Sequence, residues 1–272
     1  MQVLLSVEVF ILGLLLGSFL GLAAIRIPQG ESILWPRSHC RNCNRTLSWY
    51  ENIPVFSYLG LRGRCSSCGA AISPHHLFLE ILTALLTLFA YYQLLPWPRF
   101  LLWLLLFILP VLLLMAIDAK YLLLPFKITW PGIVAGFVVH WIDGKYWPTA
   151  SLAASSATLL LESCLGALAG GLTLGLIAWL YRVLRKSDGL GGGDIYFAAM
   201  LGAFFGWKEV FFIFFLASTI GALVGGVWIL LRRKSYDTPL PFGVFLGAVA
   251  IIYLFYGPFL LRFYLKMMHK LV

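Results

Sequence analysis

The chain has 272 residues, of which 61% are apolar and only 11% are charged, whereas about 25% of the residues of an ordinary soluble domain carry a charge. The apolar residues gather in blocks of roughly 20, which is the length that a helix needs to cross a bilayer. This composition excludes a soluble enzyme, a secreted disulfide scaffold and a disordered tail. It predicts an all-α polytopic membrane protein embedded in the lipid bilayer.

Eight apolar blocks predict about eight transmembrane helices. They are expected at 3–25, 77–95, 99–117, 128–142, 156–181, 195–206, 209–231 and 242–262. The boundary at 206–209 between the sixth and seventh blocks is weak, so seven spans is the alternative. The first block lacks a basic amino-terminal region and carries Glu8, so we expect a retained anchor rather than a signal peptide.

The net charge of +9 is explained by orientation. If the amino terminus lies outside, 14 of the 20 Lys and Arg residues fall on the inner side and 6 on the outer side. This asymmetry follows the positive-inside rule. We therefore expect an outside amino terminus and no nucleic-acid partner.

Only one connection between spans is long enough to be a small domain. The sequence thus divides into a first transmembrane helix at 1–25, a cytosolic loop domain at 26–76 and a seven-helix membrane domain at 77–272. Gly13, Gly17 and Gly21 recur every four residues in the first helix. Small residues at this spacing let two membrane helices approach closely, so we expect tight helix packing there.

The loop domain carries four cysteines in two pairs, Cys40-x-x-Cys43 and Cys65-x-x-Cys68. Two turns that each offer two thiolates can close a tetrahedron around Zn²⁺. The alternatives are two disulfides or a redox pair, and a cytosolic position argues against both because cytosolic thiols are kept reduced. Since four thiolates leave no open coordination position, the predicted zinc is structural: it folds a loop with little apolar content.

Two aspartates at the membrane face are candidates for chemistry. Asp118 ends the third block and Asp194 opens the sixth, and the predicted topology places both on the cytosolic side. Carboxylates from two helices that meet at one depth can share a proton and act as an aspartic dyad. Gly191, Gly192 and Gly193 directly precede Asp194, and their lack of side chains would let a substrate backbone approach. The alternative for Asp194 is a helix N-cap, and for either aspartate an interfacial charge.

Together these residues resemble the bacterial type IV prepilin peptidases, the GxGD class of membrane aspartic proteases. The resemblance covers nearly the whole chain. It rests on Gly17-Ser-Phe-Leu20 with Arg26-Ile-Pro28, Ser38 to Cys43, Trp49-Tyr-Glu-Asn-Ile-Pro54, Leu61 to Cys68, His76 to Thr83, Asp118, Gly191-Gly-Gly-Asp194 and Pro239-Leu-Pro-Phe-Gly243.

The resemblance implies an enzyme of the bacterial inner membrane. Its dyad, on Asp118 and Asp194, would cut the basic leader from type IV prepilins or pseudopilins at the cytosolic face. It also implies N-methylation of the newly exposed residue with S-adenosylmethionine, and zinc in the cysteine loop. No Gly-rich turn from a strand into a helix is present, so no residue is assigned to the methyl donor.

The chain departs from the usual family pattern at two positions beside the dyad. Members often have Pro-Asp where this chain has Pro125-Phe126, and often have Lys where it has Tyr196. Neither departure removes a member of the dyad, but the second changes the charge environment that we expect around Asp194. The tuning of the dyad is therefore the property that we expect to differ.

Two other classes of protein remain as alternatives. A proton-coupled transporter could use Asp118, Asp194, Glu80 and Glu162 as a relay, because ionisable groups in spans are functional candidates. A scaffold for pilus assembly could bind partners through the zinc loop. Transporters usually show an internal repeat, and the two halves of this sequence show no convincing self-similarity.

Overall fold

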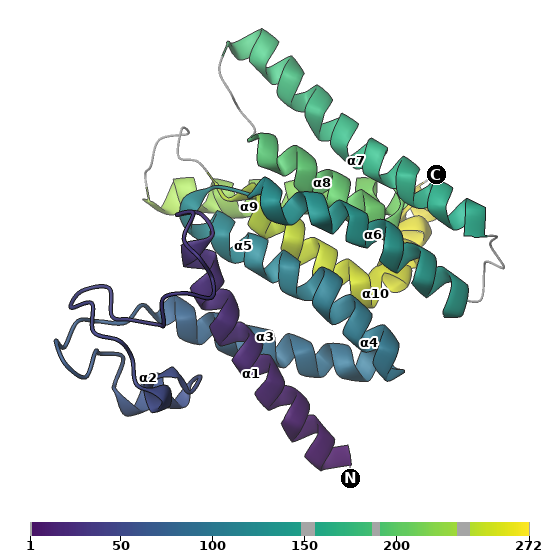
Figure 1. Ribbon diagram of the computed structural model, residues 1–272. Coiled ribbons are helices and arrows are strands. Elements are labelled where there is room, and N and C mark those ends of the chain that lie inside the picture. The colour runs from purple at the N-terminus through teal and green to yellow at the C-terminus, as the bar shows by residue number, and fades with distance from the viewer. Residues whose placement is uncertain (1, 148–155, 187–190, 233–239, 272) are drawn as a thin grey trace. The chain divides into compact units, whose positions relative to one another are not determined.

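The computed structural model describes residues 2–147, 156–186, 191–232 and 240–271, and in these residues all regular structure is helical, without a β-strand (Figure 1). The chain forms two compact units, Met1–Leu105 and Leu106–Val272. The predicted all-α membrane fold is confirmed.

The amino-terminal unit is built on two long helices, α1 (Gln2–Arg26) and α3 (Pro74–Gln93), which pack against each other (Figure 1). The glycine stripe of α1 makes this contact. A side-chain carbon at Gly13 would lie 2.6 Å from Ala84 Cα, and one at Gly17 would lie 2.6 Å from Glu80 Cα. The predicted close packing is confirmed, because only glycine leaves room for the backbone of α3.

The loop between these two helices holds little regular structure. It contains a short 3-10 helix, η1 (Trp49–Asn52), and one turn of α-helix, α2 (Phe56–Gly60). After α3 the chain continues into α4 (Trp97–Trp103), where Phe100 and Trp97 pack on Tyr91.

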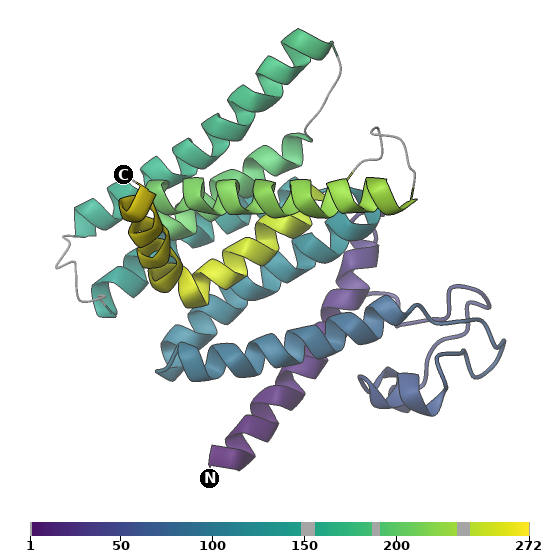
Figure 2. The same ribbon diagram turned by 180° about the vertical axis from the view of Figure 1, so that it is seen from behind.

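The carboxy-terminal unit surrounds the short helix α8, which contacts α6, α7, α9 and α10. Phe197 and Phe204 on α8 are fully buried. Figure 2 shows α9 and α10 lying next to each other, with a bend in the second half of α10. The helices of this unit are α5 (Leu109–Tyr121), α6 (Phe126–Tyr146), α7 (Ser156–Arg185), α8 (Gly192–Phe205), α9 (Trp207–Arg232) and α10 (Phe242–Leu271).

Local sequence explains where these helices begin and end. Leu122 adopts a left-handed conformation with φ 52° and ends α5. Pro125 then precedes α6, since its fixed φ suits the start of a helix. Gly206 has φ 92° and separates α8 from α9, because glycine tolerates this conformation at a helix end.

Among the described residues, five helices are long and apolar enough to cross a membrane. They are Gln2–Arg26, Pro74–Gln93, Trp97–Tyr121, Ala157–Arg185 and Trp207–Trp228. The third of these joins α4 and α5 through one π-helical turn, Leu104–Ile108. Gly192–Phe205 and Phe242–Gly257 are apolar but shorter. Helices therefore occupy all eight predicted blocks, while a count of eight spans is not confirmed.

The boundary between the two units falls near Leu105. The first helix, the cysteine loop and α3 thus belong to one unit. The division into 1–25, 26–76 and 77–272 stays a prediction.

Candidate metal centre and active site

The four predicted cysteines converge in the loop of the amino-terminal unit. The Sγ atoms of Cys40, Cys43, Cys65 and Cys68 all lie within 4.8 Å of one another, and those of Cys40 and Cys68 are 3.8 Å apart. Zn–S bonds of about 2.3 Å in a tetrahedron place two sulfurs about 3.8 Å apart. The cluster therefore fits a four-coordinate soft metal ion such as Zn²⁺.

Two turns of the same form present these thiols. The N–H of Asn44 donates to Cys40 O at 2.8 Å, and the N–H of Gly69 donates to Cys65 O at 3.0 Å. Asn44 and Gly69 both have positive φ, 55° and 69°, which Asn and Gly tolerate best. The N–H groups of Cys68 and Ser67 lower the pKa of Cys65 to about 6, which favours the thiolate that binds metals.

The buried carboxylate of Glu51 forms hydrogen bonds with residues of both cysteine turns. Glu51 accepts hydrogen bonds from Ser66 Oγ at 2.6 Å and from Ser48 N at 2.8 Å, and its Oε1 is 2.6 Å from Arg45 Nη2. These three donors lower the pKa of Glu51 to about 2. Because Arg45 follows the first cysteine pair and Ser66 lies in the second, the ionised Glu51 holds the pairs in register.

Asp118 lies in the last turn of α5 and is buried, with 5% of its surface exposed. Its Oδ2 accepts a hydrogen bond from the backbone N–H of Val244 at 3.1 Å. A side-chain carbon at Gly243 would lie 2.9 Å from the same oxygen. The start of α10 is thus built closely around the Asp118 carboxylate.

Asp194 lies in the first turn of α8, whose N-cap is Gly191. Its N–H donates to Gly191 O at 3.1 Å. Asp194 is therefore the third residue of the helix, and the alternative interpretation of this aspartate as the N-cap is wrong. Its side chain is half-buried.

Leu124 contacts a residue next to each of the two aspartates. A side-chain carbon at Gly193 would lie 2.6 Å from Leu124 O, and one at Gly243 would lie 3.0 Å from Leu124 Cδ1. The residue before Asp194 and the residue beside Asp118 therefore touch the same leucine.

The three glycines before Asp194 have different surroundings. A side chain at Gly193 would collide with Leu124, so this glycine is needed for packing within the unit. Among the described residues, no atom of another segment lies within 4 Å of the place where a side chain at Gly192 would begin, and a side chain at Gly191 would meet only Asp194 Oδ2, at 3.3 Å. The open side of this turn is formed by Gly191 and Gly192, and substrate binding there stays a prediction.

The other carboxylates of the transporter alternative have separate partners. Glu80, on α3, accepts a hydrogen bond from Val55 N at 2.8 Å. Glu162, on α7, lies 3.9 Å from Nε2 of His140 on α6. Each carboxylate joins its own pair of neighbouring segments.

Both parts of the chain match known families. Residues 11–94 match the bacterial peptidase A24 N-terminal domain, and residues 103–226 match the type IV leader peptidase family. A prepilin leader peptidase/N-methyltransferase of Aeromonas salmonicida strain A449 is 34% identical over 284 residues, which cover 95% of this chain and 93% of that protein. The chain belongs to the type IV leader peptidase family.

Further relatives carry the same name. The prepilin leader peptidase/N-methyltransferase of Pseudomonas aeruginosa strain PAO1 is 32% identical over 94% of this chain and 92% of its own length. That of Myxococcus xanthus strain DK1622 is 35% identical over 85% of this chain and 65% of its own length. No solved structure matches the chain. The cysteine cluster falls in the first matched segment, and both aspartates fall in the second.

The two residues of this leader peptidase family member that depart from the usual pattern, Phe126 and Tyr196, contact each other. The rings of Phe126 and Tyr196 pack edge to face, with 4.8 Å between their centroids and an interplanar angle of 70°. Phe126 opens α6, and Tyr196 follows Asp194 by two residues on α8. An aromatic pair therefore stands where family members often carry an acidic and a basic residue.

Sequence reasoning missed three features of these sites. The N–H of Val244 that binds Asp118 left no signal beyond the Pro-Phe-Gly pattern before it, because any residue supplies a backbone N–H. The role of Leu124 left no signal in the sequence, since one leucine among many apolar residues is not distinctive. The contact of Glu51 with Ser66 joins residues 15 positions apart and depends on the fold of the loop.

Proposed function

We propose that this protein removes the leader peptide of type IV prepilins and pseudopilins with Asp118 and Asp194 as an aspartic dyad, and then N-methylates the new amino terminus. The observation that carries the proposal is that Gly193, the residue before Asp194, and Gly243, which lies beside Asp118, both pack against Leu124. Membership of the leader peptidase family supports the substrate class.

The proposed cleavage step uses one proton shared between the two carboxyl groups. The ionised carboxylate takes a proton from a water molecule, and the resulting hydroxide attacks the carbonyl carbon of the scissile peptide bond. The protonated partner polarises the carbonyl oxygen and then gives its proton to the leaving amine, so that the peptide C–N bond breaks. Val244 N–H keeps Asp118 in place during both steps.

The methylation step is proposed from the relatives alone, whose names include N-methyltransferase. S-adenosylmethionine would supply the methyl group to the amine that cleavage exposes. No residue of this chain is assigned to that donor. The cysteine cluster would hold Zn²⁺ as a structural ion, because four thiolates leave it no open coordination position.

The proposal also places the protein in the bacterial inner membrane as a multi-pass protein. With the amino terminus outside, the cysteine loop of 26–76 and the dyad of the membrane domain of 77–272 both face the cytosol. A prepilin would then present its basic leader in the inner aqueous layer, next to anionic lipids.

The direct test uses the purified full-length protein with a synthetic prepilin, analysed by mass spectrometry. We expect loss of the leader peptide and, when S-adenosylmethionine is added, a gain of one methyl group on the mature product. A matched prepilin with its cleavage site altered controls for contaminating proteases. A transporter or a scaffold would leave the prepilin intact, and an intact prepilin would refute the proposed peptidase.

A further inference from the structure

The cysteine loop exposes a group of large apolar side chains that a soluble loop would bury. Trp49 is 80% exposed, Phe56 72%, Leu59 61% and Tyr50 54%. We call these four residues the aromatic face. They come from η1 and α2, which contact each other. An exposed apolar patch of this kind indicates an interaction surface.

A hydrogen bond fixes the position of the aromatic face along α3, a candidate membrane helix of the same unit. Val55 N donates to Oε2 of Glu80 at 2.8 Å, and Glu80 is the seventh residue of α3, a candidate span. Six residues of helix rise about 9 Å. The chain at Val55 and Phe56 therefore lies level with the second turn of α3, within about 9 Å of one end of this candidate span.

The backbone at this point is held in a costly conformation. Val55 has φ 63°, which is unfavourable for a β-branched residue. The bond to Glu80 fixes Val55 where it is. The loop is thus fastened to α3 at the residue that precedes Phe56.

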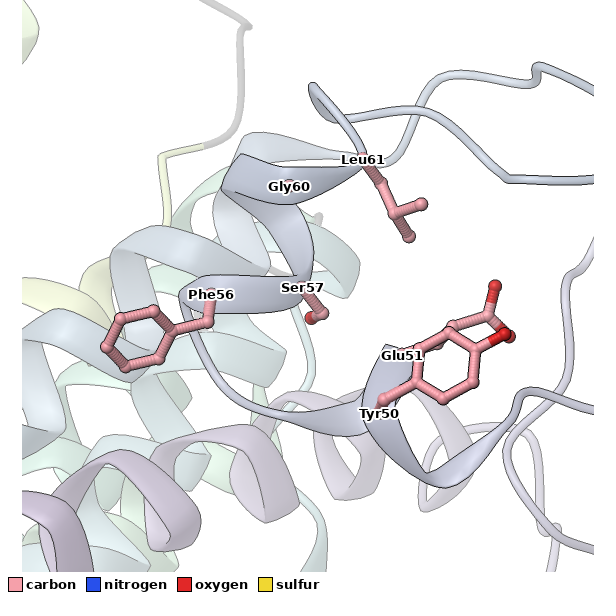
Figure 3. Close-up of a pocket in the computed structure, with 6 residues that line it drawn as sticks. All are labelled: Tyr50, Glu51, Phe56, Ser57, Gly60 and Leu61. Carbon is pink, nitrogen blue, oxygen red and sulfur yellow. The ribbon is translucent and has the colours of Figure 1, made fainter.

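A hollow of about 290 Å³ lies beside this face and is lined by Tyr50, Glu51, Phe56, Ser57, Gly60 and Leu61 (Figure 3). Each carboxylate oxygen of Glu51 already accepts two hydrogen bonds, from Arg45, Ser66 and Ser48, which uses all its acceptor sites. The carboxylate therefore offers nothing to a polar ligand. Figure 3 shows the ring of Phe56 pointing away from Tyr50 and Glu51.

The charge of the loop complements an anionic surface. Residues 26–76 contain six arginines and two glutamates. Arg62 and Arg64 follow α2 directly and are exposed. Basic residues near a membrane attract anionic lipids, and Trp and Tyr favour the interface between lipid and water.

We propose that the aromatic face inserts into the interfacial layer of the lipid leaflet that the cysteine loop faces, where Arg62 and Arg64 bind anionic phospholipid headgroups. The bilayer surface is the partner, and the metal-binding loop is thereby held against it. This proposal concerns lipid contact and does not depend on the cleavage reaction.

The test places a photo-crosslinking phenylalanine analogue at Phe56 or at Leu59 of the full-length protein. The protein is reconstituted in nanodiscs of phosphatidylcholine and phosphatidylglycerol, and adducts are identified by mass spectrometry. The control position is Thr46, an exposed polar residue of the same loop that pairs with His39. We expect about tenfold more lipid adduct at Phe56 and Leu59 than at Thr46, as interfacial burial requires.

Equal lipid adducts at the three positions would overturn the proposal. So would adducts at Phe56 that form with an added prepilin and not with lipid, because the face would then bind substrate. The double change Arg62→Gln and Arg64→Gln should lower the share of phosphatidylglycerol among the adducts, and an unchanged share would refute the role of the arginines. Repeating the experiment with Asp118→Asn separates lipid contact from activity.

Discussion

At the scale of single residues, the environment of Asp118 depends on the absence of a side chain at Gly243. A methyl group there would lie 2.9 Å from Asp118 Oδ2 and 3.0 Å from Leu124 Cδ1. Either the carboxylate or the start of α10 must then move. A displacement of about 1 Å in a catalytic group can cost on the order of a hundredfold in rate.

We therefore expect Gly243→Ala to lower kcat for prepilin cleavage by about a hundredfold while the protein still inserts in the membrane. Gly226→Ala on α9 is the matched control, because in the part of the chain that the structure describes no atom of another segment lies within 4 Å of that position. The measurement is the cleavage rate at saturating prepilin. Equal rates for the two variants would show that the contact between Gly243 and Asp118 is unimportant.

The aromatic pair of Phe126 and Tyr196 is the second feature at this scale. An edge-to-face pair contributes about 1 kcal/mol beyond burial, and Tyr196 is two residues from Asp194. We expect Phe126→Ala and Tyr196→Ala each to lower kcat/KM. In the double variant, the loss of kcat/KM should be roughly fivefold smaller than the product of the two single-variant losses.

Tyr196→Phe is the control for this cycle, because it keeps the ring and removes only the hydroxyl. We expect it to retain nearly full kcat/KM. Strictly multiplicative losses in the double variant would mean that the two rings act independently of each other.

At the scale of the elements, we expect the order of the cysteine loop to depend on a metal ion held by its four cysteines. The loop contains one short 3-10 helix and one turn of α-helix, and outside these its order comes from the two cysteine turns and Glu51. Metal binding to such a loop is coupled to its folding. The helix pair α1 and α3 has its own packing through Gly13 and Gly17.

Removal of the metal with a chelator should therefore raise hydrogen exchange across residues 38–72 and leave α7 and α8 unchanged. One equivalent of Zn²⁺ should restore the protection, while Mg²⁺ should not, because thiolates prefer soft ions. Exchange in the loop that stays the same after complete metal loss would contradict a structural metal site.

The elements themselves could largely be predicted from the sequence. Apolar blocks mark the helices because lipid requires long apolar segments, and the spacing of the four cysteines indicates their cluster because two turns can close one tetrahedron. The contacts of Val244 with Asp118, of Phe126 with Tyr196 and of Val55 with Glu80 could not be predicted. Each joins segments that are distant in sequence, and each depends on how the helices pack.

At the scale of the whole molecule, the distribution of Lys and Arg predicts the orientation in the membrane. We expect a reporter fused to the amino terminus to be accessible from the periplasm. A protease site inserted after Gln29, an exposed residue at the start of the cysteine loop, should be cut only from the cytosolic side. Accessibility of the inserted site from the periplasm would reverse the proposed topology.

We propose that Asp118 and Asp194 together perform the cleavage. The most direct test of this dyad is mass spectrometry of a prepilin co-expressed with Asp118→Asn, Asp194→Asn or Asp143→Asn. Asp143 is the matched control, because it lies 17 residues beyond Phe126 on α6, about 25 Å along the helix. We predict that the first two variants insert normally and leave the leader uncut, while Asp143→Asn processes the prepilin. Normal processing by either Asp118→Asn or Asp194→Asn would contradict the dyad.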